Sequence, residues 1–135
     1  MTAVILPPYA TALGMRIEPN DGGAPVIAQD FTSDVNGNRR AFHGGVLAGM
    51  LEIAALAALT AELDGGEGPY RLKPANVTVE YLRTAGVHTA YARGEVVRRG
   101  RRLAQLRASA WQESPDRPVA VGFINVYLAP PSGQE

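Results

Sequence analysis

The sequence contains no cysteine, a single lysine and only two histidines, His43 and His88. Without cysteine the chain has no disulfide and no thiol nucleophile, and zinc loses a frequent ligand. The two histidines lie far apart in the sequence and form no ligand-spaced pair. We therefore expect neither a metal site nor thiol catalysis.

Charge is also scarce. Charged residues make up 19% of the chain, and 13 basic residues balance 13 acidic ones. This content is below the usual value of about 25%, which indicates extra buried surface and favours an oligomer. With no excess of positive charge, neither a nucleic acid nor a membrane is the expected partner.

At 135 residues the chain is expected to form a single domain, 1–135, whose core runs from about residue 9 to residue 128. The first eight residues contain only a short apolar run and no basic segment before it, so no signal peptide is expected. The expected location is the cytoplasm.

The most informative segment runs from Val46 to Ala61. Its only residues outside Ala, Val, Ile, Leu and Met are Gly49, Glu52 and Thr60. A helix that is apolar all round is a buried helix, and this run is shorter than the roughly 20 residues that span a bilayer. We predict a buried helix from about residue 45 to residue 63, ended by the glycines and proline of residues 64–69.

Strand patterns flank this helix on both sides. A short helix at residues 9–13 should precede strands at 14–18 and 25–31, joined by a turn at 20–23. Strands at 72–83, 88–98, 103–111 and 119–128 should follow as a meander, with Gly100 in a tight hairpin. Strands that cluster around one helix predict an α+β fold with an antiparallel sheet wrapped around that helix.

Glu52 is the single charge in the apolar run from Val46 to Ala61, seven residues after Gly45 and about two turns, or roughly 10 Å, along the axis. A buried carboxylate is costly unless it is paired or has a function. The alternative is a solvent-facing or salt-bridged residue. The apolar neighbours and the preceding His43-Gly44-Gly45 turn favour a function.

These features resemble the hotdog fold, and in particular the PaaI-like acyl-CoA thioesterases. The resemblance rests on His43-Gly44-Gly45 with an acid nine residues after the histidine, on Tyr81-Leu82-Arg83, and on the arginines of 98–102. It covers residues 9 to 128. It implies thioester hydrolysis of an acyl-CoA, with no cofactor beyond the CoA of the substrate.

The resemblance also implies roles for individual residues. Glu52 takes the place of the family's nucleophile or general base, as in members similar to hydroxybenzoyl-CoA thioesterases, and the amide of Gly45 matches its oxyanion donor. The family often has an asparagine six residues before the histidine. This chain has Gly37 there, so Asn36 or Asn38 would serve only after a one-residue shift. His43 either orients the turn or contacts the substrate.

The expected substrate contacts are less specific. Candidates for binding the acyl-CoA, including the CoA phosphates, are Gly44, Arg83, Thr84, Arg98, Arg99, Arg101 and Arg102. The alternatives are that Arg83 caps a strand end and that the other arginines form a solvated hairpin. Tyr81 and Trp111 are expected to be core or interface residues.

Two other functions remain open. A hotdog dehydratase or hydratase would use a histidine and an acid, but its signature has a proline-rich loop after the histidine, and residues 44–51 contain no proline. A non-catalytic acyl-CoA-binding protein would not need Glu52. In each case the exposed edges of the sheet favour a homodimer or a homotetramer.

Overall fold

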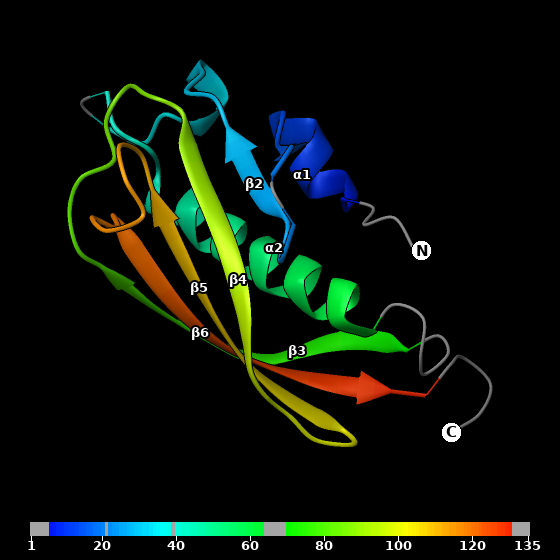
Figure 1. The fold of residues 1–135 in the computed structure, drawn as a ribbon. Helices are drawn as coiled ribbons and strands as arrows, with labels where there is room; N and C mark the ends of the chain where they lie inside the picture. The colour runs from blue at the N-terminus through cyan, green and yellow to red at the C-terminus, as the bar shows by residue number, and fades with distance from the viewer. Residues whose placement is uncertain (1–5, 21, 39, 64–69, 131–135) are drawn as a thin grey trace.

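The computed structural model describes residues 6–20, 22–38, 40–63 and 70–130. Residue 21 of the predicted turn and the predicted helix stop at 64–69 lie outside these ranges. In chain order the elements are α1 (Pro8–Leu13), β1 (Arg16–Glu18), β2 (Val26–Gln29), a 3-10 turn (Ser33–Val35), α2 (Gly44–Leu63), β3 (Arg71–Tyr81), β4 (Ala90–Arg99), β5 (Leu103–Trp111) and β6 (Ala120–Ala129). Each predicted helix and strand is therefore present, with ends that differ by a few residues (Figure 1).

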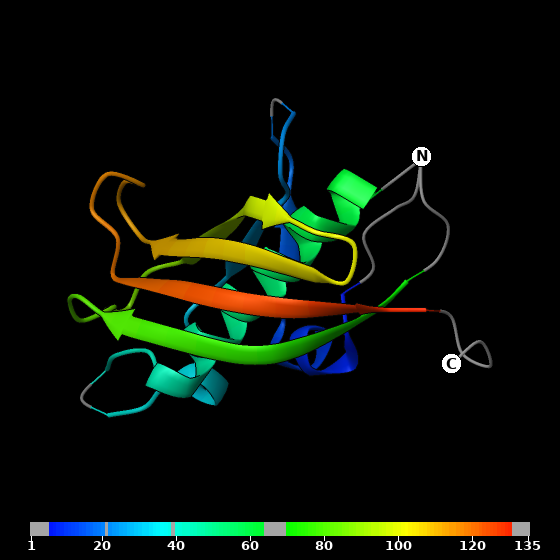
Figure 2. The ribbon, with the colours of Figure 1, turned by 90° about the horizontal axis from the view of Figure 1, so that it is seen from below.

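The strands form one antiparallel sheet in the order β1-β2-β4-β5-β6-β3. The predicted four-stranded meander is wrong in one respect. Strands β4, β5 and β6 form a meander, but β3 pairs with β6 at the far edge and does not pair with β4 (Figure 2). The alternation of side chains specifies which face of a strand is buried, but it does not specify the neighbouring strand.

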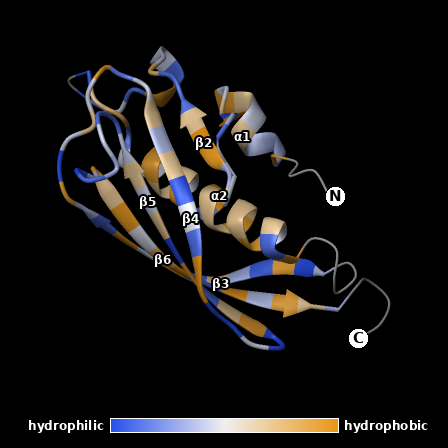
Figure 3. Cartoon of the chain, in the orientation of Figure 1, coloured by the Kyte–Doolittle hydropathy of each residue, from blue (hydrophilic) through white to orange (hydrophobic). Residues whose placement is uncertain are grey.

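Helix α2 lies against one face of this sheet, and Figure 3 shows that α2 is apolar along most of its length. Small residues on the sheet allow the close approach. A Cβ atom on Gly94 would lie 2.5 Å from the carbonyl oxygen of Ala54 and 2.7 Å from the Cα of Ala55. The sheet face also contributes the buried alanines Ala90, Ala92, Ala104, Ala108, Ala110 and Ala120. The helix contributes large buried side chains such as Met50 and Leu51, and the sheet adds Ile27 and Ile124.

Helix α2 is not buried on all sides, which corrects the prediction from its composition. Ten of its 20 residues are buried. A stripe along its length is partly or fully exposed in the single chain, and we call it the open stripe; it comprises Gly45, Ala48, Gly49, Glu52, Leu56 and Thr60. With 20 residues, α2 is long and apolar enough to cross a membrane, but here it is the core helix of a sheet.

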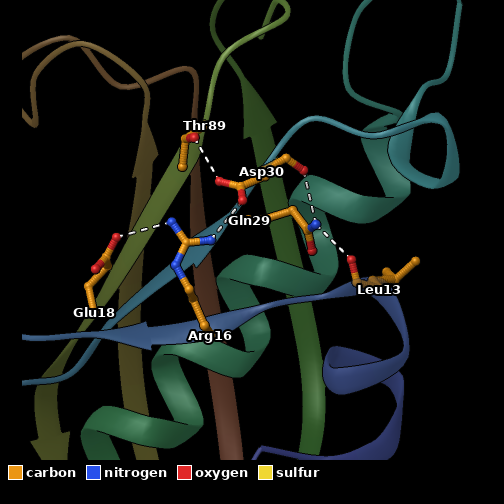
Figure 4. A network of polar contacts seen from close by, with 6 residues as sticks. All are labelled: Leu13, Arg16, Glu18, Gln29, Asp30 and Thr89. Carbon is orange, nitrogen blue, oxygen red and sulfur yellow. Dashed lines mark hydrogen bonds and ion pairs between the residues drawn. The ribbon is translucent and has the colours of Figure 1, made fainter.

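A polar network fixes the edge of the sheet where β1 and β2 pair (Figure 4). Asp30 accepts a hydrogen bond of 2.9 Å from the hydroxyl of Thr89 and forms an ion pair of 3.1 Å with Arg16. Arg16 also contacts Glu18 at 3.3 Å. These contacts join β1, the end of β2 and the segment that leads into β4.

Candidate functional site

The loop before α2 closes on itself and fixes the start of the helix. Asn36 pairs with Phe42 in an isolated antiparallel bridge, and the amide of Gly37 donates to the carbonyl of Ala41 at 2.8 Å. The amide of His43 donates to the carbonyl of Val35 at 2.8 Å. His43 is therefore held at the N-cap of α2 by backbone hydrogen bonds.

Gly37 lies so close to this cap that no side chain fits without a backbone shift. A Cβ atom there would lie 2.8 Å from the Cα and 3.1 Å from the amide nitrogen of His43. The flanking Asn36 and Asn38 are exposed. Within the described residues, neither asparagine side chain makes a hydrogen bond.

The first turn of α2 distinguishes two neighbouring amides. The N–H of Gly45 donates to Nδ1 of His43 at 2.9 Å. The carbonyl of His43 accepts from the amides of Val46 at 3.0 Å and Leu47 at 3.3 Å. Among the described residues, the N–H of Gly44 has no partner. The free donor at the positive end of the helix is therefore the amide of Gly44, whereas the family resemblance assigns this role to Gly45.

Tyr81 meets the same turn from the end of β3. Its hydroxyl donates to the carbonyl of Gly44 at 2.8 Å, and its ring would lie 3.4 Å from a Cβ on that glycine. The side chain is 54% exposed in the single chain, so it is not a core residue. The sequence indicated the end of a strand here, but nothing in it indicated a contact with the helix N-terminus.

Arg83 and Thr84 follow Tyr81 and lie at this end of the molecule. The amide of Phe42 donates to the carbonyl of Ala85 at 2.8 Å, which brings the segment after β3 alongside the loop before α2. Both Arg83 and Thr84 are exposed. The predicted substrate contacts Gly44, Arg83 and Thr84 are thus gathered around the N-terminus of α2.

Glu52 lies on the open stripe and is partly buried. Within the described residues its carboxylate makes no hydrogen bond or ion pair, so the salt-bridged alternative for this residue is not supported. Burial and the negative charge of Glu52 together raise the pKa of the Tyr9 phenol. Tyr9 belongs to α1, and the sequence did not indicate it as a site residue.

The arginines of the β4–β5 hairpin surround a separate cavity. The turn is closed by a hydrogen bond of 2.8 Å from the amide of Gly100 to the carbonyl of Leu103. A cavity of about 610 Å³, which we call the arginine pocket, is lined by Arg98, Gly100, Arg101, Arg102, Leu103 and Gln105. Arg99 is only partly exposed and does not line it.

The arginine pocket and the N-terminus of α2 lie toward opposite ends of the sheet. Leu103, beside the pocket, pairs with Tyr127 of β6, whereas Tyr81 pairs with Ala120. These β6 partners are seven residues apart, or roughly 23 Å at about 3.3 Å per residue. Within one chain, the predicted CoA contacts therefore fall into two separate groups.

Metal chemistry receives no support from the described residues, which contain no group of three or more His, Cys, Asp or Glu side chains arranged to hold an ion.

Comparison with known proteins finds a family for the segment that contains both the N-terminus of α2 and the arginine pocket. The family model described as the acyl-CoA thioesterase N-terminal domain matches residues 32–126. No curated protein matches the sequence.

Solved structures match almost the whole chain. A phenylacetic acid degradation-related protein from Ralstonia eutropha is 23% identical, with a TM-score of 0.76 over 93% of this chain and 92% of that chain. A mutant of the phenylacetic acid degradation protein PaaI from Thermus thermophilus is 24% identical, with a TM-score of 0.75 over 90% and 99%. A Bacillus halodurans protein solved with CoA is 16% identical, with a TM-score of 0.79 over 90% and 78%. At these identities the similarity establishes the fold, and it confirms the predicted hotdog architecture.

Proposed function

The chain belongs to the acyl-CoA thioesterase N-terminal domain family, and we propose that it hydrolyses an acyl-CoA to a free acid and CoA. The observation that carries the proposal is the partly buried carboxylate of Glu52 on the open stripe. That carboxylate has no partner among the described residues and lies on the helix whose first amide, that of Gly44, is free. A charge that nothing nearby neutralises is available for chemistry.

In this reaction the amide of Gly44 donates a hydrogen bond to the thioester oxygen, where negative charge develops. In the general-base route, Glu52 takes a proton from water and the water oxygen bonds to the carbonyl carbon. The C–S bond then breaks as the proton passes to sulfur. In the nucleophilic route, the carboxylate of Glu52 bonds to the carbonyl carbon, CoA leaves, and water hydrolyses the resulting anhydride. Both routes use this chain's own residues and no metal or cofactor.

A single chain does not bring these two groups close enough. Gly44 and Glu52 are eight residues apart on one helix, which corresponds to about 12 Å along the axis. For one thioester carbonyl to contact the amide and the carboxylate at the same time, these two groups must lie within roughly 7 Å of each other, because each contact spans about 3 Å. Bending the Glu52 side chain toward the N-terminus recovers at most about one helical turn, or roughly 5 Å, which still leaves about 7 Å along the axis. Eight residues also turn Glu52 by about 80° around the helix relative to Gly44, so the remaining separation exceeds this limit.

We therefore place the reaction between two protomers. With the two α2 helices antiparallel, the open stripes face each other, and Glu52 of one protomer approaches the amide of Gly44 in its partner. Strand β3 supports the same arrangement, because it is an 11-residue strand at the edge of the sheet, and an edge can pair with a second copy. A homotetramer would double this dimer.

The arginine pocket is the proposed site for the CoA phosphates. It gathers Arg98, Arg101 and Arg102 around a cavity in a chain whose net charge is zero. Guanidinium groups bind phosphate through paired, charge-assisted hydrogen bonds. Arg83, at the other end of the sheet, is the alternative contact.

Release of free thiol from a panel of aliphatic and aromatic acyl-CoAs tests the proposed function. The wild type should release thiol from at least one member, and Glu52→Gln should lose at least about 100-fold in kcat, because the substitution is nearly isosteric and removes the base. Glu62→Gln, at the exposed end of the same helix, is the matched control and should keep wild-type turnover. Binding of acyl-CoA without thiol release would instead favour a non-catalytic acyl-CoA-binding protein.

A further inference from the structure

The short helix α1 is fixed against the body of the protein. Ala10 is fully buried, and the helix ends at Gly14, whose φ of 89° is left-handed and suits glycine. The amide of Met15 then donates to the carbonyl of Ala10 at 2.9 Å. From β2, the side chain of Gln29 donates to the carbonyl of Leu13 at 2.7 Å (Figure 4). The second residue of α1, Tyr9, is therefore held in a defined position.

The Tyr9 ring lies directly on the backbone of α2 at Gly49. A Cβ atom on Gly49 would lie 2.8 Å from the Tyr9 hydroxyl oxygen and 2.9 Å from Cε2. Only a residue without a side chain admits the phenol this closely. Gly49 precedes Glu52 by three residues, and residues with this spacing share one face of a helix. The hydroxyl thus lies on the open stripe, less than one helical turn from Glu52.

The electrostatics of the pair agree with this geometry. Burial, together with the negative charge of Glu52, raises the pKa of Tyr9. The phenol therefore keeps its proton throughout the neutral range, and a protonated hydroxyl beside a carboxylate acts as a hydrogen-bond donor. Tyr9 is still 48% exposed in the single chain, so the residue is not sealed in the core.

In the single chain the Tyr9 hydroxyl lies near the Glu52 carboxylate without a hydrogen bond between them. We propose that Tyr9 is a positioning residue of the hydrolytic site, whose hydroxyl donates to the Glu52 carboxylate when substrate is bound and holds it in one orientation for reaction. This inference rests on the proposed function and deepens it. The alternative is that the ring simply covers apolar surface of α2. That alternative requires the ring but not the hydroxyl.

Replacing Tyr9 with phenylalanine distinguishes a positioning role of the hydroxyl from a ring that only covers apolar surface. Tyr9→Phe keeps the ring on Gly49 and removes the donor, so kcat should fall about tenfold, the lower end of the range for a hydrogen bond to a charged group. KM and the melting temperature should stay near their wild-type values. Tyr91→Phe is the matched control, because Tyr91 stacks on Trp111 on the sheet face away from α2 and should keep full activity. An unchanged kcat in Tyr9→Phe, or a change confined to KM, would overturn the inference.

A titration that does not depend on turnover completes the test. In protein labelled with ¹³C at tyrosine Cζ, the Tyr9 signal is the one that Tyr9→Phe lacks. Removing the neighbouring negative charge in Glu52→Gln should lower the Tyr9 titration midpoint, whereas Glu62→Gln should leave it unchanged. The same midpoint in Glu52→Gln and wild type would refute the contact, even if the enzyme is active. If the wild type releases no thiol, the proposed function fails, and the titration still decides whether the two groups are neighbours.

Discussion

The backbone N–H of Gly45 donates a hydrogen bond of 2.9 Å to Nδ1 of His43. In this geometry Nδ1 accepts, so a neutral His43 ring carries its proton on Nε2. The histidine therefore acts as a side-chain cap for α2, in the manner of Ser or Asp at other helix N-termini. This agrees with the interpretation in which His43 orients the turn, and it leaves the neighbouring amide of Gly44 free.

Gly45→Ala should lower the rate without lowering stability. The new Cβ would lie 3.1 Å from Nδ1 of His43 and 3.2 Å from Cε1, so the imidazole must move by a few tenths of an ångström. The φ angle of Gly45 is not positive, and alanine is a better helix former than glycine by about 1 kcal/mol in a helix interior. The displaced imidazole weakens the cap that fixes the first turn and the Gly44 amide, so we expect kcat to fall severalfold. The weakened cap and the better helix propensity of alanine offset each other, so the melting temperature should stay about the same. A melting temperature that falls in parallel with kcat would contradict this account.

Gly94→Ala should destabilise the fold by about 1–3 kcal/mol, the usual cost of overpacking. Its Cβ would press on backbone atoms of α2 at Ala54 and Ala55, which cannot rotate away. Gly86→Ala is the control, since a Cβ there meets nothing within 4 Å. Chemical denaturation of the two variants measures the difference. Equal stability would mean that α2 has room to retreat from the sheet.

Neutralising Arg101 or Arg102 should raise KM for an acyl-CoA severalfold and leave KM for a short pantetheine thioester unchanged. The pantetheine compound lacks the nucleotide phosphates, and charge-assisted contacts to phosphate weaken with salt. Arg117→Gln, in the exposed β5–β6 turn, is the control. The same test on Arg83→Gln decides which end of the sheet binds the nucleotide. An equal rise for both substrates would point to folding or the subunit interface.

Asp30→Asn should destabilise the protein at neutral pH but not in acid. The hydrogen bond from Thr89, followed by the one from Arg16, lowers the pKa of Asp30 in the folded state. A lowered pKa stabilises the fold above the unfolded value of about 3.9, and the contribution is lost as pH falls through the folded value. The stability gap between wild type and variant should therefore shrink as the pH falls below about 4 and close below the folded-state pKa of Asp30. A gap that persists in acid would assign the effect to packing.

The secondary structure and the helix that carries Glu52 were predictable because they depend on local periodicity. The place of β3 beside β6 was not, since alternation in residues 71–81 fits either neighbour equally well. The open stripe was also missed, because an apolar composition describes a buried helix and an interface helix alike. The contacts of Tyr9 and Tyr81 with α2 depend on how distant elements pack, and neither leaves a signal in the sequence around it.

The edge position of β3 has a consequence for biosynthesis. Strand β3 pairs with β6, as Tyr81 does with Ala120, and β4 and β5 lie between them in the chain. Strand β3 therefore leaves the ribosome well before its partner β6 is made. During that interval β3 is an unpaired strand that can join the wrong neighbour. Lys73, the only lysine of the chain, and Pro74, beside an irregularity in register, lie in its first half. Both features discourage pairing of the first half of β3, which is exposed longest, and they leave its second half as the part of the edge that can pair with a second copy.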